Sequence, residues 1–197
     1  MENTLASKLI ATVMVLALVA TVLTLTALTL FTDTQSVPGN TFTTGTVDIS
    51  TSPTSALVTF SGMAPGDQVV NPITVTNAGT LQLRYAVTST TTENTLAAQL
   101  DMTIWDENEE ADGGTTCNAT APATVLYAPA DLGSTGGTNV IGNPAQGSQA
   151  GDRTLNAAAS EVLCVKVSLP SSTGNTFQGL TSTATFAFQA EQTSNNP

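Results

Sequence analysis

The sequence predicts an all-β protein, an antiparallel β-sandwich of two sheets that follows an N-terminal hydrophobic helix. Past residue 40 the apolar side chains recur with period two, which is typical of strands that bury one face. Turn-forming residues separate these short runs, and no long stretch past residue 40 has the 3.6-residue period of an amphipathic helix. These features favour two packed sheets over a helical or mixed fold.

The chain begins with an apolar leader. Residues 9–31 contain no charged side chain over 23 positions, and about 20 apolar residues suffice to cross a bilayer. Lys8 and the α-amino group precede this run, which is typical of a signal peptide or a signal anchor. We therefore divide the chain into a leader, residues 1–30, and a single β-sandwich domain, residues 31–197.

The charge of the chain limits its partners. The formal net charge is −11, and the basic side chains past the leader are Arg84, Arg153 and Lys166, which form no patch in the sequence. Such a chain repels nucleic-acid phosphates and anionic lipid surfaces. We expect no nucleic-acid partner, and a membrane contact only through the leader if it is not cleaved.

The chain has two cysteines, Cys117 and Cys164. A pair of cysteines in an exported chain usually forms a disulfide, so we predict a Cys117–Cys164 bridge. Two free buried thiols are the alternative interpretation. Because Cys164 has the opposite parity to Leu163 and Val165, the bridge is expected on the outer face of its sheet.

The predicted strands follow one another along the domain. The first candidates are residues 42–50, with a bulge at Gly45 where the apolar parity shifts, then 56–61 and 69–77. Clear period-two alternation follows in residues 81–88, 100–104, 163–169 and 184–188. Residues 92–100 could hold one short helical turn. We expect a long surface loop over residues 128–160, with room for a small hairpin, and a disordered polar tail over residues 191–197.

The residue types argue against catalysis. The chain contains no histidine, which removes HExxH zinc sites and every triad or general base that uses histidine. A Ser-Lys dyad would need Lys166, which lies among alternating strand residues and is expected on a solvated strand face. We therefore predict that the protein is not an enzyme, has no catalytic residues and needs no cofactor, with calcium as the open exception.

That exception rests on the stretch Trp105–Gly114. Its carboxylates crowd into seven positions and comprise Asp106, Glu107, Glu109, Glu110 and Asp112. Oxygen ligands at this density could bind Ca²⁺ weakly, at the millimolar level of extracellular modules. The alternative, which we favour, is a solvated acidic loop, because runs of charge are usually exposed.

Several stretches together resemble one family. The segment FTDTQSVPGNTFTTGTVDIS after the leader, the block MAPGDQVVNPITVTNAGTLQLRYAV, and the C-terminal stretches AGDRTLNAAASEVLCVKVSLP and FQGLTSTATFAFQAEQT resemble the TasA/camelysin family. The resemblance implies a jelly-roll-like sandwich, export through a SipW-type signal peptidase, and cleavage near Leu30 and Phe31. Leucine at positions 28 and 30 suits a signal peptidase poorly, so cleavage after Ala27 and retention as an anchor both stay open.

The resemblance also implies a function. It predicts a secreted structural protein that polymerises with itself into fibres of the cell surface or biofilm matrix. Two alternatives remain: a membrane-anchored monomeric adhesion module, and a secreted metal-dependent endopeptidase, which rests on the label of some family members alone.

The segment that would polymerise is the mature N-terminus, residues 31–50. It contains the strand-favouring or terminal residues Phe31, Thr32, Asp33, Phe42, Val47 and Ile49, and a hinge at Pro38-Gly39. We predict that it adds as a strand to the sheet of the next subunit. In the alternative, residues 41–50 form the first strand of their own sheet and only residues 31–40 are free to be donated.

Overall fold

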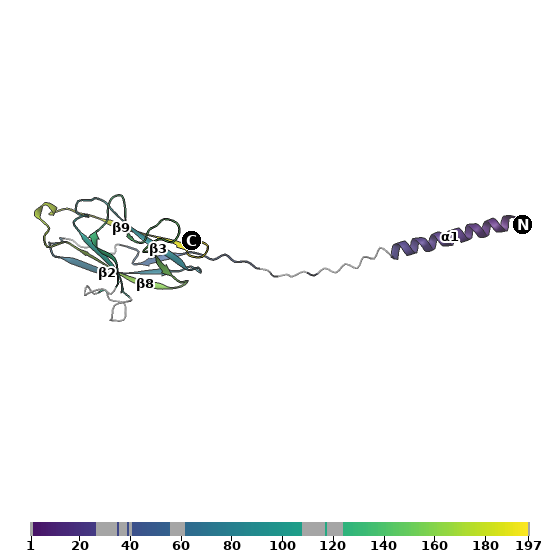
Figure 1. The fold of residues 1–197 in the computed structure, drawn as a ribbon, viewed down its shortest axis with the longest axis horizontal. Helices are drawn as coiled ribbons and strands as arrows, with labels where there is room; N and C mark the ends of the chain where they lie inside the picture. The colour runs from purple at the N-terminus through teal and green to yellow at the C-terminus, as the bar shows by residue number, and fades with distance from the viewer. Residues whose placement is uncertain are drawn as a thin grey trace. The chain divides into compact units, whose positions relative to one another are not determined.

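The computed structural model describes residues 2–26, 35, 39, 41–55, 62–107, 117 and 124–196. It divides into two compact units, Met1–Thr43, which contains the helix, and Thr44–Pro197, which we call the β unit. Figure 1 shows both units. The helix α1 spans Glu2–Thr26. Among the described residues, no helix is long and apolar enough to cross a membrane.

The β unit is a sandwich of two sheets whose named strands pair antiparallel. Its elements are β1 Ile49–Ser52, β2 Gln68–Asn77, β3 Leu83–Thr91, β4 Asp101–Asp106, β5 Val125–Asp131, β6 Thr138–Ile141, β7 Arg153–Leu155, β8 Ser160–Ser168, the 3-10 helix η2 Asn175–Phe177, and β9 Ala184–Gln192. The predicted all-β sandwich is confirmed.

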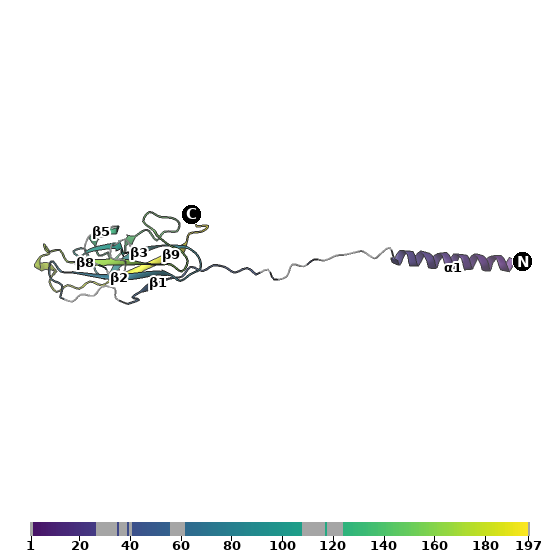
Figure 2. The same ribbon diagram turned by 90° about the horizontal axis from the view of Figure 1, so that it is seen from below.

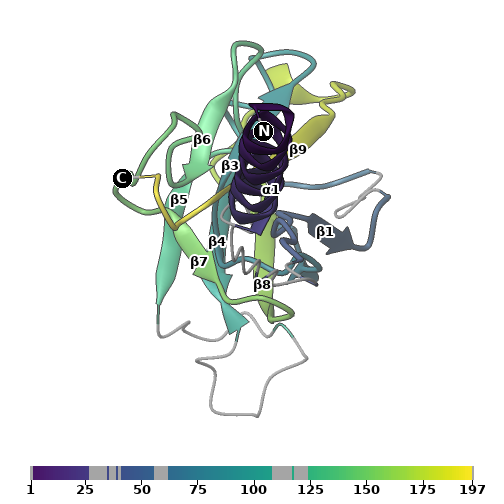
Figure 3. The ribbon, with the colours of Figure 1, turned by 90° about the vertical axis from the view of Figure 1, so that its right-hand side faces the viewer.

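The two sheets differ in width. The wider sheet has the order β1-β2-β8-β4-β5, so β1 and β5 form its opposite margins (Figure 3). In the smaller sheet β3 is central: β6 and β7 follow one another along one of its edges, and β9 pairs with the whole length of the other. β3 and β9 lie side by side over β2 and β8 (Figures 1 and 2).

The core lies between the inner faces of the sheets. Leu83, Tyr85 and Val87 of β3 are almost fully buried and share one parity, as do Leu163 and Val165 of β8. Burying a large apolar side chain contributes about 1.5–3 kcal/mol, so this alternation is the main source of stability. The period-two pattern in the sequence thus identified the strands β2, β3, β4, β8 and β9 near their observed bounds.

The predicted long loop over residues 128–160 is wrong. Strand β5 runs to Asp131, and β6 and β7 also lie within this stretch. These two strands have only four and three residues, and they bind in tandem to the same edge of β3. β6 buries Val140 and Ile141 there, and β7 buries Leu155. Segments this short carry too few side chains for a period to be recognised.

The predicted disordered tail is also wrong over most of its length. Strand β9 continues to Gln192. The Thr193 N–H then donates to the Gln82 carbonyl at 3.2 Å, and the Asn196 carbonyl accepts from Arg84. The predicted short helical turn is present, since Leu100 N–H donates to the Leu96 carbonyl at 3.0 Å.

Candidate assembly surface and buried ion cluster

Along the chain, the first contacts with the rest of the β unit are made at Gly45 and Thr46. The Thr46 carbonyl accepts from the N–H groups of Thr80 at 3.0 Å and Leu81 at 3.1 Å, just before β1 begins. The Leu81 side chain lies over Gly45, where an added Cβ would stand 2.5 Å from it. Gly45 lies outside any strand, so its role is to permit this close approach, and the predicted bulge is not observed.

The predicted polymerisation residues fall into three groups. Phe31, Thr32 and Asp33 lie outside the described residues, as do the cleavage site at Leu30 and the candidate strand at 56–61. Phe42 is 95% exposed and Val47 is 38% exposed. Ile49 belongs to β1, pairs with Asn77 of its own β2 and packs against the core. The structure therefore places β1 in its own sheet.

One side of the sandwich carries two incompletely paired strands. β9 pairs with β3, and no other described strand pairs with it. β1 covers only Thr74–Asn77 of β2, so Gln68–Ile73 pair with β8 but with no described strand on the other edge. β1 also lies beside β9, which places both edges on the same side of the sandwich.

The inner face of β9 is unusually exposed for a core strand. Its inward side chains are only half-buried, whereas those of β3 beside it are buried. These half-buried apolar side chains are Ala184, Phe186, Phe188 and Ala190. A sheet edge with exposed backbone and half-covered apolar side chains can accept a further strand.

A second feature lies between the sheets, where four polar side chains meet. Tyr85 and Arg153 come from the small sheet, and Glu161 comes from the wide sheet. The Tyr85 hydroxyl donates to Glu161 Oε1 at 2.6 Å, and Arg153 Nε donates to Glu161 Oε2 at 3.1 Å. Arg153 Nη2 also bonds Asp106 and Glu161. We call Tyr85, Asp106, Arg153 and Glu161 the ion cluster.

The ion cluster favours a neutral Tyr85 and a charged Arg153. Burial raises the pKa of Tyr85 far above its ordinary value, and the charge of Glu161 together with the hydrogen bond to it adds to the rise. Burial alone would lower the pKa of Arg153, but its bonds to Glu161 and the charges of Glu161 and Asp106 raise it overall. The cluster thus joins two carboxylates to one guanidinium and one neutral phenol, and it ties the two sheets together.

The raised pKa of Tyr85 predicts alkaline destabilisation. An unfolded tyrosine loses its proton near about pH 10, while folded Tyr85 keeps it. Stability should therefore fall above that pH, by about 1.4 kcal/mol per pH unit for this one group. Urea unfolding between about pH 8 and about pH 11 measures the slope.

Tyr85→Phe should make that alkaline slope shallower, because it removes the titrating hydroxyl. At neutral pH the variant should lose about 1–3 kcal/mol, since Glu161 keeps its buried carboxylate without this donor. Tyr127→Phe is the comparison variant: the Tyr127 hydroxyl donates to the Asp131 carbonyl at 3.1 Å. Burial and the charge of Asp131 raise the pKa of Tyr127 as well, so its replacement should also make the slope shallower, but less than Tyr85→Phe does. An unchanged slope in Tyr85→Phe would contradict the assignment.

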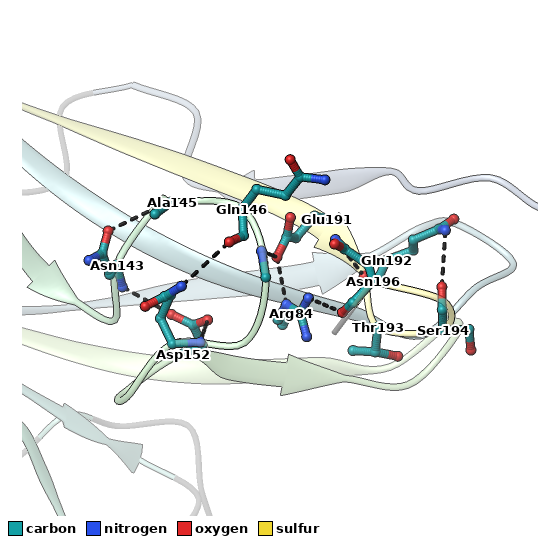
Figure 4. Close-up of polar contacts among 12 residues, drawn as sticks. Arg84, Asn143, Ala145, Gln146, Asp152, Glu191, Gln192, Thr193, Ser194 and Asn196 are labelled. Atoms are coloured by element: carbon teal, nitrogen blue, oxygen red, sulfur yellow. Dashed lines mark hydrogen bonds and ion pairs between the residues drawn. The ribbon is translucent and has the colours of Figure 1, made fainter.

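A third polar group covers the outer face of the small sheet (Figure 4). Arg84 Nε donates to Glu191 at 2.6 Å, and the Gly147 N–H donates to the same carboxylate at 2.9 Å. The hydrogen bond from Arg84 lowers the pKa of Glu191. The Asp152 carboxylate accepts from the N–H groups of Asn143 and Gln149. The bond from Gly147 fastens the loop of residues 142–152 to β9, and the bonds to Asp152 hold the loop together.

A small cavity lies beneath that loop. Its volume is about 90 Å³, and Arg84, Asn143, Asp152 and Glu191 contribute to its wall. Ligand pockets usually have volumes of about 300–1,000 Å³. The cavity therefore has room for a few water molecules rather than for a substrate.

The predicted disulfide is present. Cys117 and Cys164 are bonded, with their Cα atoms 5.5 Å apart. Cys164 pairs with Trp105 of β4 and lies on the outer face of the wide sheet, as its parity predicted. Both Cys164 and Trp105 are buried, so this patch of the outer face is shielded from water.

The structure divides the predicted calcium ligands. Asp106 ends β4 on the inner face and is bonded to Arg153, and Glu107 is fully buried. Neither belongs to a solvated loop, which corrects that part of the sequence interpretation. The reason is parity: Asp106 continues the inward series of Met102 and Ile104. Glu109, Glu110 and Asp112 lie outside the described residues, and calcium binding stays a prediction.

Together these features define the class of the protein: an N-terminal apolar helix followed by an all-β sandwich with a single disulfide between its two cysteines. The chain belongs to the camelysin metallo-endopeptidase family, because the model of that family matches residues 4–196. The family resemblance seen in the sequence is thus confirmed. A search of curated proteins gave no significant match.

Proposed function

We propose that this protein is an exported structural subunit that polymerises with itself into fibres of the cell surface or matrix. Each subunit donates its N-terminal segment as a strand to the β unit of the next. The observation that supports this most directly is the incomplete edge of β9, where Phe186 and Phe188 are half-buried. An added strand would pair with the edge of β9 that no described strand covers, and would shield both rings.

We assign the donor to the residues before Gly45. From that glycine onward the chain is held by its own β unit, through the bonds of Thr46 and the pairing of β1. Residues 31–44 extend over about 46 Å as a strand, and the nine residues of β9 need about 30 Å. The donor is therefore long enough to cover the whole edge. Donation from head to tail does not close on itself, so it yields a filament.

The same segment favours a fibre subunit over an anchored monomer. Phe42 is almost fully exposed, and a large apolar side chain in that state is suited to burial in a partner. An anchored adhesion module would need no such burial, and its leader would remain attached to the β unit.

A truncation tests the donor. We expect a mature chain that begins at Phe31 to form filaments, and a chain that begins at Thr41 to stay folded and monomeric, since it lacks most of the strand. Negative-stain electron microscopy and analytical ultracentrifugation measure the two outcomes. Filaments from the Thr41 chain, equal to those of the longer chain, would rule out donation by residues 31–40.

A locked variant tests whether β1 is exchanged instead. Ser50 and Thr76 are cross-strand partners in β1 and β2, so Ser50→Cys with Thr76→Cys should bond β1 to its own sheet. We expect this variant to polymerise as the parent does when oxidised. Loss of filaments on oxidation, and their return on reduction under conditions that preserve the fold, would show that β1 itself is donated.

The acceptor edge has its own matched pair of variants. Phe186→Ala should weaken polymerisation because it removes apolar surface that the donor would cover. In the isolated β unit the substitution should lower the free energy of unfolding only modestly. Truncating a fully buried phenylalanine costs about 3–5 kcal/mol, and Phe186 is only half-buried. Thr185→Ala, on the outer face of the same strand, should polymerise normally. Equal polymerisation of both variants would move the acceptor away from the inner face of β9.

A further inference from the structure

The family description names a metallo-endopeptidase, and the residues of this chain can be tested against that chemistry. Catalytic zinc in peptidases is held by three protein ligands, commonly histidine with a carboxylate, and keeps one open position for water. The sequence contains no histidine. Both cysteines are used in the disulfide. Only carboxylates remain as ligands, and zinc sites built from carboxylates alone are not the peptidase pattern.

The described carboxylates do not assemble such a site either. Among the residues that the structure describes, no three acidic or cysteine side chains gather closely enough to hold a metal ion. Asp106 and Glu161 come nearest to it, because they approach from neighbouring strands and their side chains are only 9% and 7% exposed. The place between them is filled by the guanidinium of Arg153, which bonds both.

We infer that Arg153 is the resident cation of this buried carboxylate pair, and that the chain does not act as a metallo-endopeptidase. A metal ion at this place would have to displace the half-buried guanidinium of Arg153, which would then lose both of its carboxylate partners. Tyr85 donates to the remaining oxygen of Glu161, so the carboxylate is further committed to the protein itself. The cluster links the two sheets through ion pairs and hydrogen bonds among its own side chains.

The other described carboxylates near a cavity or turn are engaged in the same way. Asp152 and Glu191 accept from backbone N–H groups beside the small cavity. Glu93 accepts from the N–H groups of Thr95, Leu96 and Ala97, at the start of the short helical turn. None of these arrangements leaves a cluster of oxygens that converge on an empty position.

Zinc content and zymography test the inference on the full chain. After incubation with zinc chloride and dialysis, native mass spectrometry should find no retained zinc, and the melting temperature should be the same with zinc and with EDTA. In a gelatin zymogram soaked in zinc, the band of the chain should clear no gelatin. The paired variant Asp106→Asn with Glu161→Gln should give the same result as the parent.

Two outcomes would overturn the inference. One is a zinc ion retained by the parent and lost by the paired variant, which would show that Asp106 and Glu161 bind metal despite Arg153. The other is zinc-dependent clearing at the band of the parent chain, whichever carboxylates supply it. Polymerisation in the presence of EDTA is a separate measurement. If no filaments form there, the proposal that strand donation needs no metal is contradicted. The conclusion from the zinc measurements would not change.

Discussion

Replacing Arg153 with methionine should lower the free energy of unfolding by about 3 kcal/mol, at the lower end of the range for breaking a buried ion pair. The variant leaves the carboxylates of Asp106 and Glu161 buried near each other with no cation between them. The lower end is appropriate because the Arg153 side chain is 24% exposed. Urea denaturation with an unchanged m-value measures the loss.

Two further variants separate charge from packing. Lys166→Met replaces another basic side chain, on the outer face of β8, which forms no ion pair with a described residue. It should alter stability by less than about 0.5 kcal/mol. Adding Asp106→Asn and Glu161→Gln to Arg153→Met should recover part of the loss, because amides are less costly to bury than unpaired carboxylates. A loss of the same size after this addition would assign the effect to lost packing.

Removing the disulfide should have a comparable effect. Its cysteines are 47 positions apart in the sequence, and opening a loop of that length costs about 4 kcal/mol in the chain-entropy account. Cys117→Ala with Cys164→Ala should therefore melt well below the parent. Differential scanning calorimetry of the β unit measures this shift.

Reduction of the parent supplies the control for that double variant. Because Cys164 is fully buried, the alanine also removes buried sulfur, and this adds a packing loss to the effect of the open loop. Dithiothreitol opens the loop in the parent and should leave the melting of the double variant unchanged. If reduction leaves the parent unchanged as well, the bridge contributes little and the variant reports on packing.

The sequence predicted the strands that can be recognised from their own residues. β3 and β8 alternate apolar and polar side chains over nine residues each, which is long enough for a period to stand out. β1 is shorter than predicted because Gly45 and Thr46 bind the turn before β3 instead of a neighbouring strand. That contact depends on residues more than 30 positions away, so the sequence around Gly45 does not predict it.

The ion cluster was not predicted, although part of the signal was there. Asp106 has the parity of Met102 and Ile104, and Glu161 has the parity of Leu163, so extending each alternation by one step puts both carboxylates on the inner face. Their charge favoured a solvated position instead. Arg153 gave no such signal, because β7 has only three residues and its partners lie in the other sheet.

The ion pairs of the two arginines have a consequence for how subunits meet one another. Arg84 and Arg153 each form ion pairs with carboxylates of the same chain, within the β unit. Lys166 is then the remaining basic side chain past the leader, against a net charge of −11. Neighbouring subunits in a fibre would therefore repel each other at low ionic strength. Dissolved salt shortens that repulsion to about 8 Å at physiological concentration, so the length of the filaments would rise with the salt content of the surroundings.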